Sequence, residues 1–215
     1  MRGNLFGPDT IFARGMNQVG NVIAVTLLWL AGCLPIVTIG GSAIAMYYTI
    51  VKAVRHGEGY ITKEFLRAYK RNLKNGMMMT VVLLALGGVL GVDRIYMDQS
   101  QSQVAAAMSL GYTLLILVMA GLLVYIWPVM SRFEMGKWKC FRLAFLMVFR
   151  HLPFTVMFLV LWILGICAVV LVPVPMMFVI PGACCYIESL FMEKLLRKYM
   201  SGPRTEEDLE KWYYR

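Results

Sequence analysis

The chain has 215 residues, of which 60% are hydrophobic and only 15% are charged, and its mean hydropathy is +0.67. A soluble domain has about half apolar and about a quarter charged residues, so this composition indicates that lipid solvates much of the chain. The formal charge of +9 does not indicate nucleic-acid binding, because the basic residues lie between long uncharged stretches. That distribution is typical of the positive-inside rule beside anionic lipid head groups.

The first uncharged stretch runs from Gly15 to Val51. As a single helix it would be about 55 Å long, against about 30 Å of hydrocarbon in a bilayer. Pro35 and the Gly40-Gly41 pair divide it, and both are residues that interrupt helices. We therefore predict two crossings, near 17–34 and 37–53, joined by a tight turn at 34–38. A crossing followed by a re-entrant segment is the alternative interpretation.

The rest of the chain contains four further apolar segments, and the last two are separated by Pro173 and Pro175. We predict crossings near 75–92, 105–130, 152–172 and 176–195. Lys and Arg dominate the loops 52–75 and 131–151, whereas the segment 93–104 has one Arg against two Asp. Because an excess of Lys and Arg marks the cytoplasmic side, six crossings place both basic loops, both termini and the tail 201–215 in the cytoplasm.

The two basic loops resemble each other when the chain is shifted by 76 positions, which places Phe65 on Phe141 and Tyr69 on Phe145. Each loop is expected to form an amphipathic helix, here called an elbow helix, that lies at the membrane interface. Its aromatic residues would face the hydrocarbon, and its cations would face the lipid phosphates. The fold class is thus an all-α polytopic membrane bundle, a single domain with parallel half-repeats 36–92 and 105–172. The alternative interpretation is that any such helix at the inner leaflet is rich in aromatic and basic residues, so that the similarity of the two loops does not require an internal repeat.

The crossings contain few residues that could carry chemistry, so we expect no catalytic site, no cofactor and no metal site. Glu188 is the one acid within an apolar stretch, and we interpret it as a carboxylate that reaches the head groups or pairs with a loop cation. The five cysteines have no CxxC spacing, and the two histidines lie far apart. Gly87 and Gly91 form a GxxxG pair, which predicts close helix packing with a partner or a second copy.

The stretch from Leu34 to Gly76 contains a Leu-Pro-x-x-Thr-x-Gly turn with Pro35, Thr38 and Gly40, then Ala-Met-Tyr-Tyr at 45–48. It continues with a Gly-Tyr-x-x-x-x-Phe-x-x-Ala-Tyr-Lys-x-Asn segment at 59–72. With these motifs the stretch resembles the YesL family of bacterial integral membrane proteins. What the resemblance implies is a plasma-membrane protein, mostly of Gram-positive bacteria, encoded beside oligosaccharide ABC importers, their sensor kinases and glycan-degrading enzymes. The family's biochemical role is unassigned.

We therefore expect a non-enzymatic accessory subunit of a carbohydrate import or sensing system, with the lipid bilayer and importer or sensor membrane proteins as its partners. The alternative is a transport or permease subunit in its own right. The expected interaction surface lies on the two elbow helices and consists of Phe65, Arg67, Tyr69, Lys70, Asn72, Lys74, Arg142, Phe145 and Arg150.

The predicted topology can be tested with reporter fusions. Fusions after Gly57, after Gly136 and at the C-terminus should all score cytoplasmic, because each follows a basic segment. A fusion at Gln101 should score external. An external score at Gly57 would contradict the arrangement of the first crossings.

Overall fold

A computed structural model describes residues 11–98, 103–133 and 135–200. The predicted cytoplasmic tail 201–215 and the external position Gln101 lie outside these residues. The described chain is helical, in the order α1 (Ile11–Gly32), η1 (Ile36–Thr38), α2 (Ile39–Thr49), η2 (Ile50–Arg55), α3 (Ile61–Asp98), α4 (Gln103–Arg132), α5 (Lys137–Arg150), α6 (Leu152–Leu171) and α7 (Pro173–Arg197).

Five helical stretches of the described chain are long and apolar enough to cross a bilayer, namely Ile36–Arg55, Ile61–Met97, Ala107–Arg132, Leu152–Leu171 and Val174–Arg197. The first predicted crossing is a shorter apolar helix, Met16–Gly32. These helices expose large apolar side chains; Leu164 is 62% and Val170 is 73% exposed on α6. Such a surface requires lipid, and the prediction of a polytopic helical membrane bundle is confirmed.

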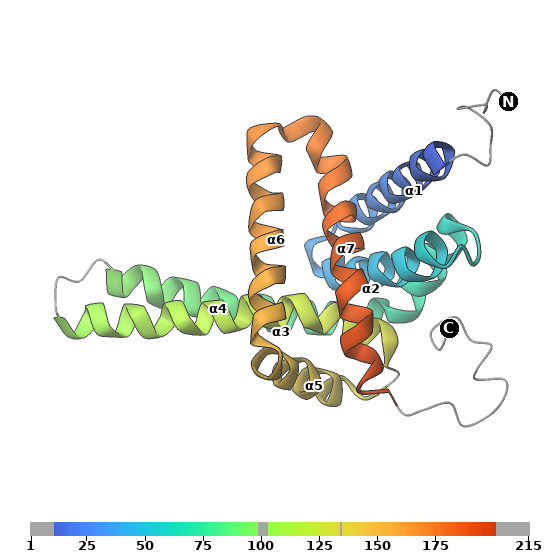
Figure 1. The fold of residues 1–215 in the computed structure, drawn as a ribbon. Coiled ribbons are helices and arrows are strands. Elements are labelled where there is room, and N and C mark those ends of the chain that lie inside the picture. Colours follow the sequence, from blue (N-terminus) through green and yellow to red (C-terminus); the bar gives the residue numbers. More distant parts are fainter. Residues whose placement is uncertain (1–10, 99–102, 134, 201–215) are drawn as a thin grey trace, which may run out of the picture.

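The helices form three pairs that meet near one centre (Figure 1). Helices α6 and α7 form one antiparallel hairpin, α3 and α4 form a second that runs across it, and α1 lies beside α2. Helix α2 with η2 is the most buried of the five long spans, and it packs most extensively against α3. The core around it includes Ile44, Ile50, Tyr125, Phe158 and Met192, each fully buried.

The first apolar stretch is divided at Pro35, as the sequence predicts. Helix α1 ends at Gly32, and the hydroxyl of Thr38 donates to the carbonyl oxygens of Gly32 and Pro35, each at 2.7 Å. The bond to Gly32 satisfies a carbonyl that the end of α1 leaves without a helical partner. The backbone N–H of Gly40 then donates to Thr80 Oγ1 at 2.9 Å and fixes the turn on α3.

Glycines allow α2 and α3 to pack backbone against backbone. A Cβ added at Gly76 would lie 2.4 Å from the backbone nitrogen of Gly41, and one at Gly40 would lie 2.7 Å from the Gly76 carbonyl oxygen. The turn at Pro35 therefore lies beside the middle of α3. From Gly76 that helix continues to Asp98, a further ~33 Å at the α-helical rise. The α1–α2 pair thus ends well short of the turn between α3 and α4.

The two predicted elbow helices differ in form. The first is not a separate helix but the N-terminal part of α3, which runs without a break through the charged and apolar segments. No proline interrupts it, and Gly76 is held within the helix by its packing on α2. The second elbow is the separate helix α5, because the chain turns at His151 and Pro153 begins the next helix. The internal repeat remains a prediction.

The two glycines expected to mediate helix packing, Gly87 and Gly91, lie in the C-terminal half of α3. A Cβ at Gly87 would lie 3.1 Å from the Met119 side chain of α4, whereas one at Gly91 would meet nothing within 4 Å. Gly87 therefore packs within the chain. Contact of either glycine with a partner remains a prediction.

We predict that Gly76→Ala lowers the stability of the purified protein in detergent by about 1–3 kcal/mol, because the new methyl group would meet backbone atoms that cannot move aside. Thermal unfolding should show the loss. Gly88→Ala is the matched control on the same helix: a Cβ there meets nothing within 4 Å, so alanine's higher helix propensity should leave stability equal or higher. Equal melting temperatures for the two variants would contradict the close approach.

Candidate functional site

The aromatic stripe of the first elbow faces the protein core. Phe65 is 2% exposed and stacks on Tyr69, with ring centroids 6.1 Å apart and an interplanar angle of 11°. The Tyr69 hydroxyl donates to the carbonyl oxygen of Gly32 at 3.5 Å, at the end of α1. These contacts, with the packing of α2 on Gly76, fix the rotation of α3 about its axis.

The opposite face of this N-terminal part of α3 carries cations. Five of them are exposed, namely Lys63, Arg67, Lys70, Arg71 and Lys74. These five side chains share one face of the helix, and we call this row of Lys and Arg charges the α3 basic face.

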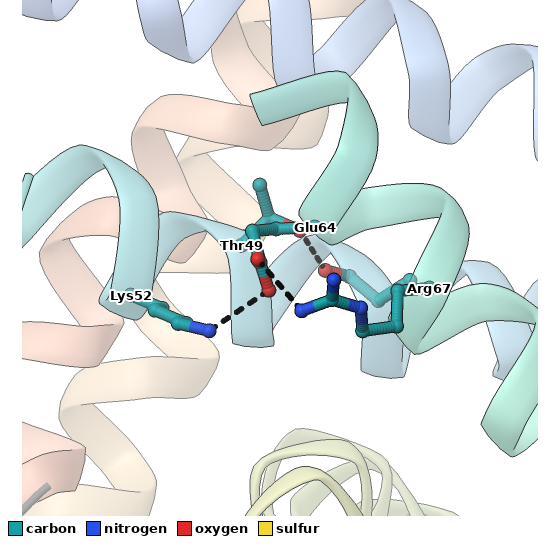
Figure 2. A network of polar contacts seen from close by, with 5 residues as sticks. Thr49, Lys52, Glu64 and Arg67 are labelled. Atoms are coloured by element: carbon teal, nitrogen blue, oxygen red, sulfur yellow. Dashed lines mark hydrogen bonds and ion pairs between the residues drawn. The ribbon is translucent and has the colours of Figure 1, made fainter. Parts of the chain in front are cut away.

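Arg67 is held by a buried carboxylate. Glu64 is 5% exposed, and its two oxygens bind Lys52 Nζ at 2.9 Å and an Arg67 guanidinium nitrogen at 3.0 Å (Figure 2). The loop before α3 closes over this carboxylate at Gly59, whose φ of +89° suits glycine. A Cβ there would lie 3.0 Å from Glu64 Cγ. Arg67 is thus partly committed to an internal ion pair, and the i,i+3 spacing of Glu64 and Arg67 was the signal for it in the sequence.

The remaining predicted residues of the first elbow border two surface hollows. The Asn72 amide donates to the Ala68 carbonyl oxygen at 3.0 Å within α3, and Asn72 also lines a polar pocket between α3, α4 and α5. Lys74 lines an apolar groove on the outer side of α3. Of the predicted residues, Asn72 is the one that the structure brings to the second elbow.

The second elbow, α5, exposes Trp138, Phe145 and Phe149, whereas Phe141 packs against the core. Its buried side consists of Cys140, Ala144, Met147 and Val148. Phe145 is 41% exposed and contacts Phe149 edge to face at 5.0 Å. Arg142 and Arg150 are exposed too, and Arg150 lies over the Tyr199 ring at 6.0 Å. Because Tyr69 contacts the core while Phe145 does not, the α5 aromatic stripe is the one suited to an interface with lipid.

A second polar site, which the sequence did not reveal, lies between the spans. Glu193 of α7 pairs with Arg132 at the end of α4 and accepts a hydrogen bond from the Tyr47 hydroxyl of α2 at 3.0 Å. The side chains of Arg132 and Glu193 are 4% and 7% exposed. Buried charges of this kind hold spans together and mark functional sites in membrane proteins.

Glu188 belongs to the same region, and the prediction that it reaches the head groups is wrong. It is 4% exposed, and its carboxylate accepts a hydrogen bond from Trp162 Nε1 of α6 at 2.8 Å. One turn further along α7, Met192 is fully buried and Leu195 nearly so. The spacing of Glu188, Met192 and Leu195 could have predicted this burial, because it places all three on the same, inward-facing side of the helix.

The neighbouring Ser189 ties α7 to the end of the second span. Arg55 donates to its carbonyl oxygen at 2.8 Å. In chemical terms the buried site offers carboxylates, a guanidinium and hydroxyls that link α2, η2, α4, α6 and α7. Among the described residues no group of three His, Cys, Asp or Glu side chains is placed to hold a metal ion.

Comparison with known protein families gives one match. The profile of a family described as a protein of unknown function, DUF624, matches residues 22–94. This segment runs from α1 through α2 into α3 and includes the Pro35 turn, the aromatic stripe and the α3 basic face. The chain is similar to that family over about a third of its length. Neither the curated proteins nor the solved structures include a significant match.

We predict that Glu193→Gln destabilises the protein by about 3–5 kcal/mol, because it removes the carboxylate that faces the buried Arg132 guanidinium. Thermal unfolding in detergent measures the loss. The control is Glu188→Gln, whose amide oxygen still accepts the Trp162 N–H, and whose effect should be about 1 kcal/mol or less. A larger loss for Glu188→Gln than for Glu193→Gln would contradict the assigned roles.

Proposed function

We propose that this protein is a non-enzymatic accessory subunit of the plasma membrane that associates with an oligosaccharide ABC importer or with its sensor. The observation that carries the proposal is the α3 basic face, a row of exposed cations on a helix whose other side is buried. In this proposal both termini and the basic face lie in the cytoplasm, where the nucleotide-binding and signalling parts of such systems lie.

The rigidity of the basic face supports docking to a protein. Phe65 and Tyr69 fix the helix rotation, so Lys63, Lys70 and Lys74 project at set positions. Charges at fixed positions give specificity and a faster association with a complementary acidic surface. Lipid attraction depends mainly on total charge and does not require such an arrangement.

A transport subunit is the second candidate, and Glu188 favours it. A carboxylate buried between spans, with an indole N–H as hydrogen-bond donor, is a feature of proton and substrate pathways. The two candidates differ in what the buried acid does. In an accessory subunit Glu188→Gln leaves sugar import by the host unchanged, and in a transport subunit it reduces import.

We predict that Lys63→Glu with Lys70→Glu abolishes association with the importer or sensor, because the change reverses two charges of the docking surface. Association is measured by placing a photo-crosslinking residue at Arg71, which directly follows Lys70, and identifying the captured membrane protein by mass spectrometry. Capture of an importer permease or sensor membrane domain by the unmodified surface is the expected result.

The matched control is Lys194→Glu with Lys198→Glu, an equal charge change at exposed positions near the end of α7. It should leave capture unchanged. If both double variants reduce capture equally, or if lysines added elsewhere restore it, total charge is responsible and the basic face is a membrane anchor.

A further inference from the structure

A polar pocket of about 340 Å³ lies where α3, the end of α4 and the start of α5 meet. Its lining includes two cations and three neutral hydrogen-bonding side chains, namely Arg71, Lys137, Asn72, Asn75 and Ser131. No acidic residue is among the described lining residues. The described lining therefore combines two positive charges with amide and hydroxyl donors, which is the chemistry that binds a phosphate group.

Two further features of the pocket favour an anion. The first turn of α5 forms part of the wall, and a helix N-terminus carries a partial positive charge. Cys140, which also lines the pocket, adds no negative charge: burial raises the pKa of its thiol. Its sulfur lies 3.8 Å from the Phe133 carbonyl oxygen and 3.7 Å from that of Met135.

An apolar groove of about 500 Å³ lies next to this pocket on α3. It is lined by Leu73, Lys74, Met77, Met78, Val81 and Val82. Lys137 joins the two hollows, because it lines the polar pocket and its Nζ lies 3.1 Å from the sulfur of Met78 in the groove. One side chain thus contacts both the polar and the apolar region.

The order of the two hollows along α3 matches the structure of a phospholipid. Asn72 and Asn75, in the polar pocket, precede the apolar part of the helix, and Val81 and Val82 lie about two to three turns further along it. A lipid phosphate lies at this polar boundary, and its acyl chains extend into the hydrocarbon. Basic pockets on the cytoplasmic side of membrane proteins bind anionic lipid head groups in this way.

We propose that the chain holds one anionic phospholipid, with its phosphate in the pocket between α3 and α5 and an acyl chain along the α3 groove. An anionic head group fits better than a zwitterionic one because the described lining supplies two cations and no carboxylate to pair with an amine. This proposal does not rest on the accessory role. Arg71 and Lys74 belong both to the α3 basic face and to the two hollows, so the tests below change Lys137 and the groove and leave the basic face intact.

The first test uses the full chain in nanodiscs of mixed phosphatidylglycerol and phosphatidylcholine, with retained lipid identified by native mass spectrometry. The expected result is one retained phosphatidylglycerol. Lys137→Gln should lower its retention about fivefold, the effect of one cation at an anionic surface. Lys139→Gln is the matched control, an equal charge loss at an exposed position of α5 outside the pocket. Equal losses in the two variants would show diffuse attraction and overturn the proposal.

The second test fills the groove without changing charge. Val81→Trp, at a 50% exposed position, should reduce phosphatidylglycerol retention, whereas Leu84→Trp, at a 51% exposed position outside the groove, should not. Unfolding temperatures check that both variants are folded. Inorganic phosphate is the competing probe: if it displaces the bound species, or if Val81→Trp leaves retention unchanged, the pocket takes a free anion and the lipid assignment is wrong.

Discussion

The backbones of α2 and α3 approach so closely at Gly41 and Gly76 that a Cβ on Gly76 would lie 2.4 Å from the nitrogen of Gly41. Most of the other features depend on this contact. It places the Pro35 turn against Thr80, lets Phe65 and Tyr69 pack toward the core, and thereby turns the cations of α3 outward. Backbone contact of this kind supplies much of the attraction between helices in lipid, where the hydrophobic effect is weak.

Buried polar groups connect the remaining spans to this pair. Glu193 links α7 to α2 and α4, and Glu188 links it to α6. In a low-dielectric interior such groups are strongly disfavoured unless paired, so each restricts how the helices can be arranged. The protein therefore combines a glycine-packed N-terminal part with a C-terminal hairpin held by polar contacts.

The two elbow segments have similar sequences and different surroundings. In the first, Phe65 is buried and the cations lie on the exposed face. In the second, Phe145 is exposed beside Arg142, which suits the lipid interface. Their meeting point is the pocket lined by Asn72 and Lys137. The two segments therefore present different surfaces, cations on α3 and aromatic side chains on α5.

Most residues of the motif that resembles the YesL family have a structural explanation. Thr38 closes the Pro35 turn, Gly40 permits the approach of α3, and Gly59 makes room for Glu64. The motif therefore specifies how α1, α2 and α3 pack. For this reason a distinctive motif, and a family match over residues 22–94, define an architecture more directly than an activity.

The sequence by itself determined the membrane class, the apolar segments and the break at Pro35. All of these follow from hydropathy, helix-breaking residues and helical periodicity, which are local properties. Only the tertiary structure decided that α3 continues through its elbow, that Glu188 is buried, and that Arg132 meets Glu193. It also brought Asn72 to Lys137. Those features depend on which helix faces lie together, and contacts between residues far apart in the chain set that arrangement.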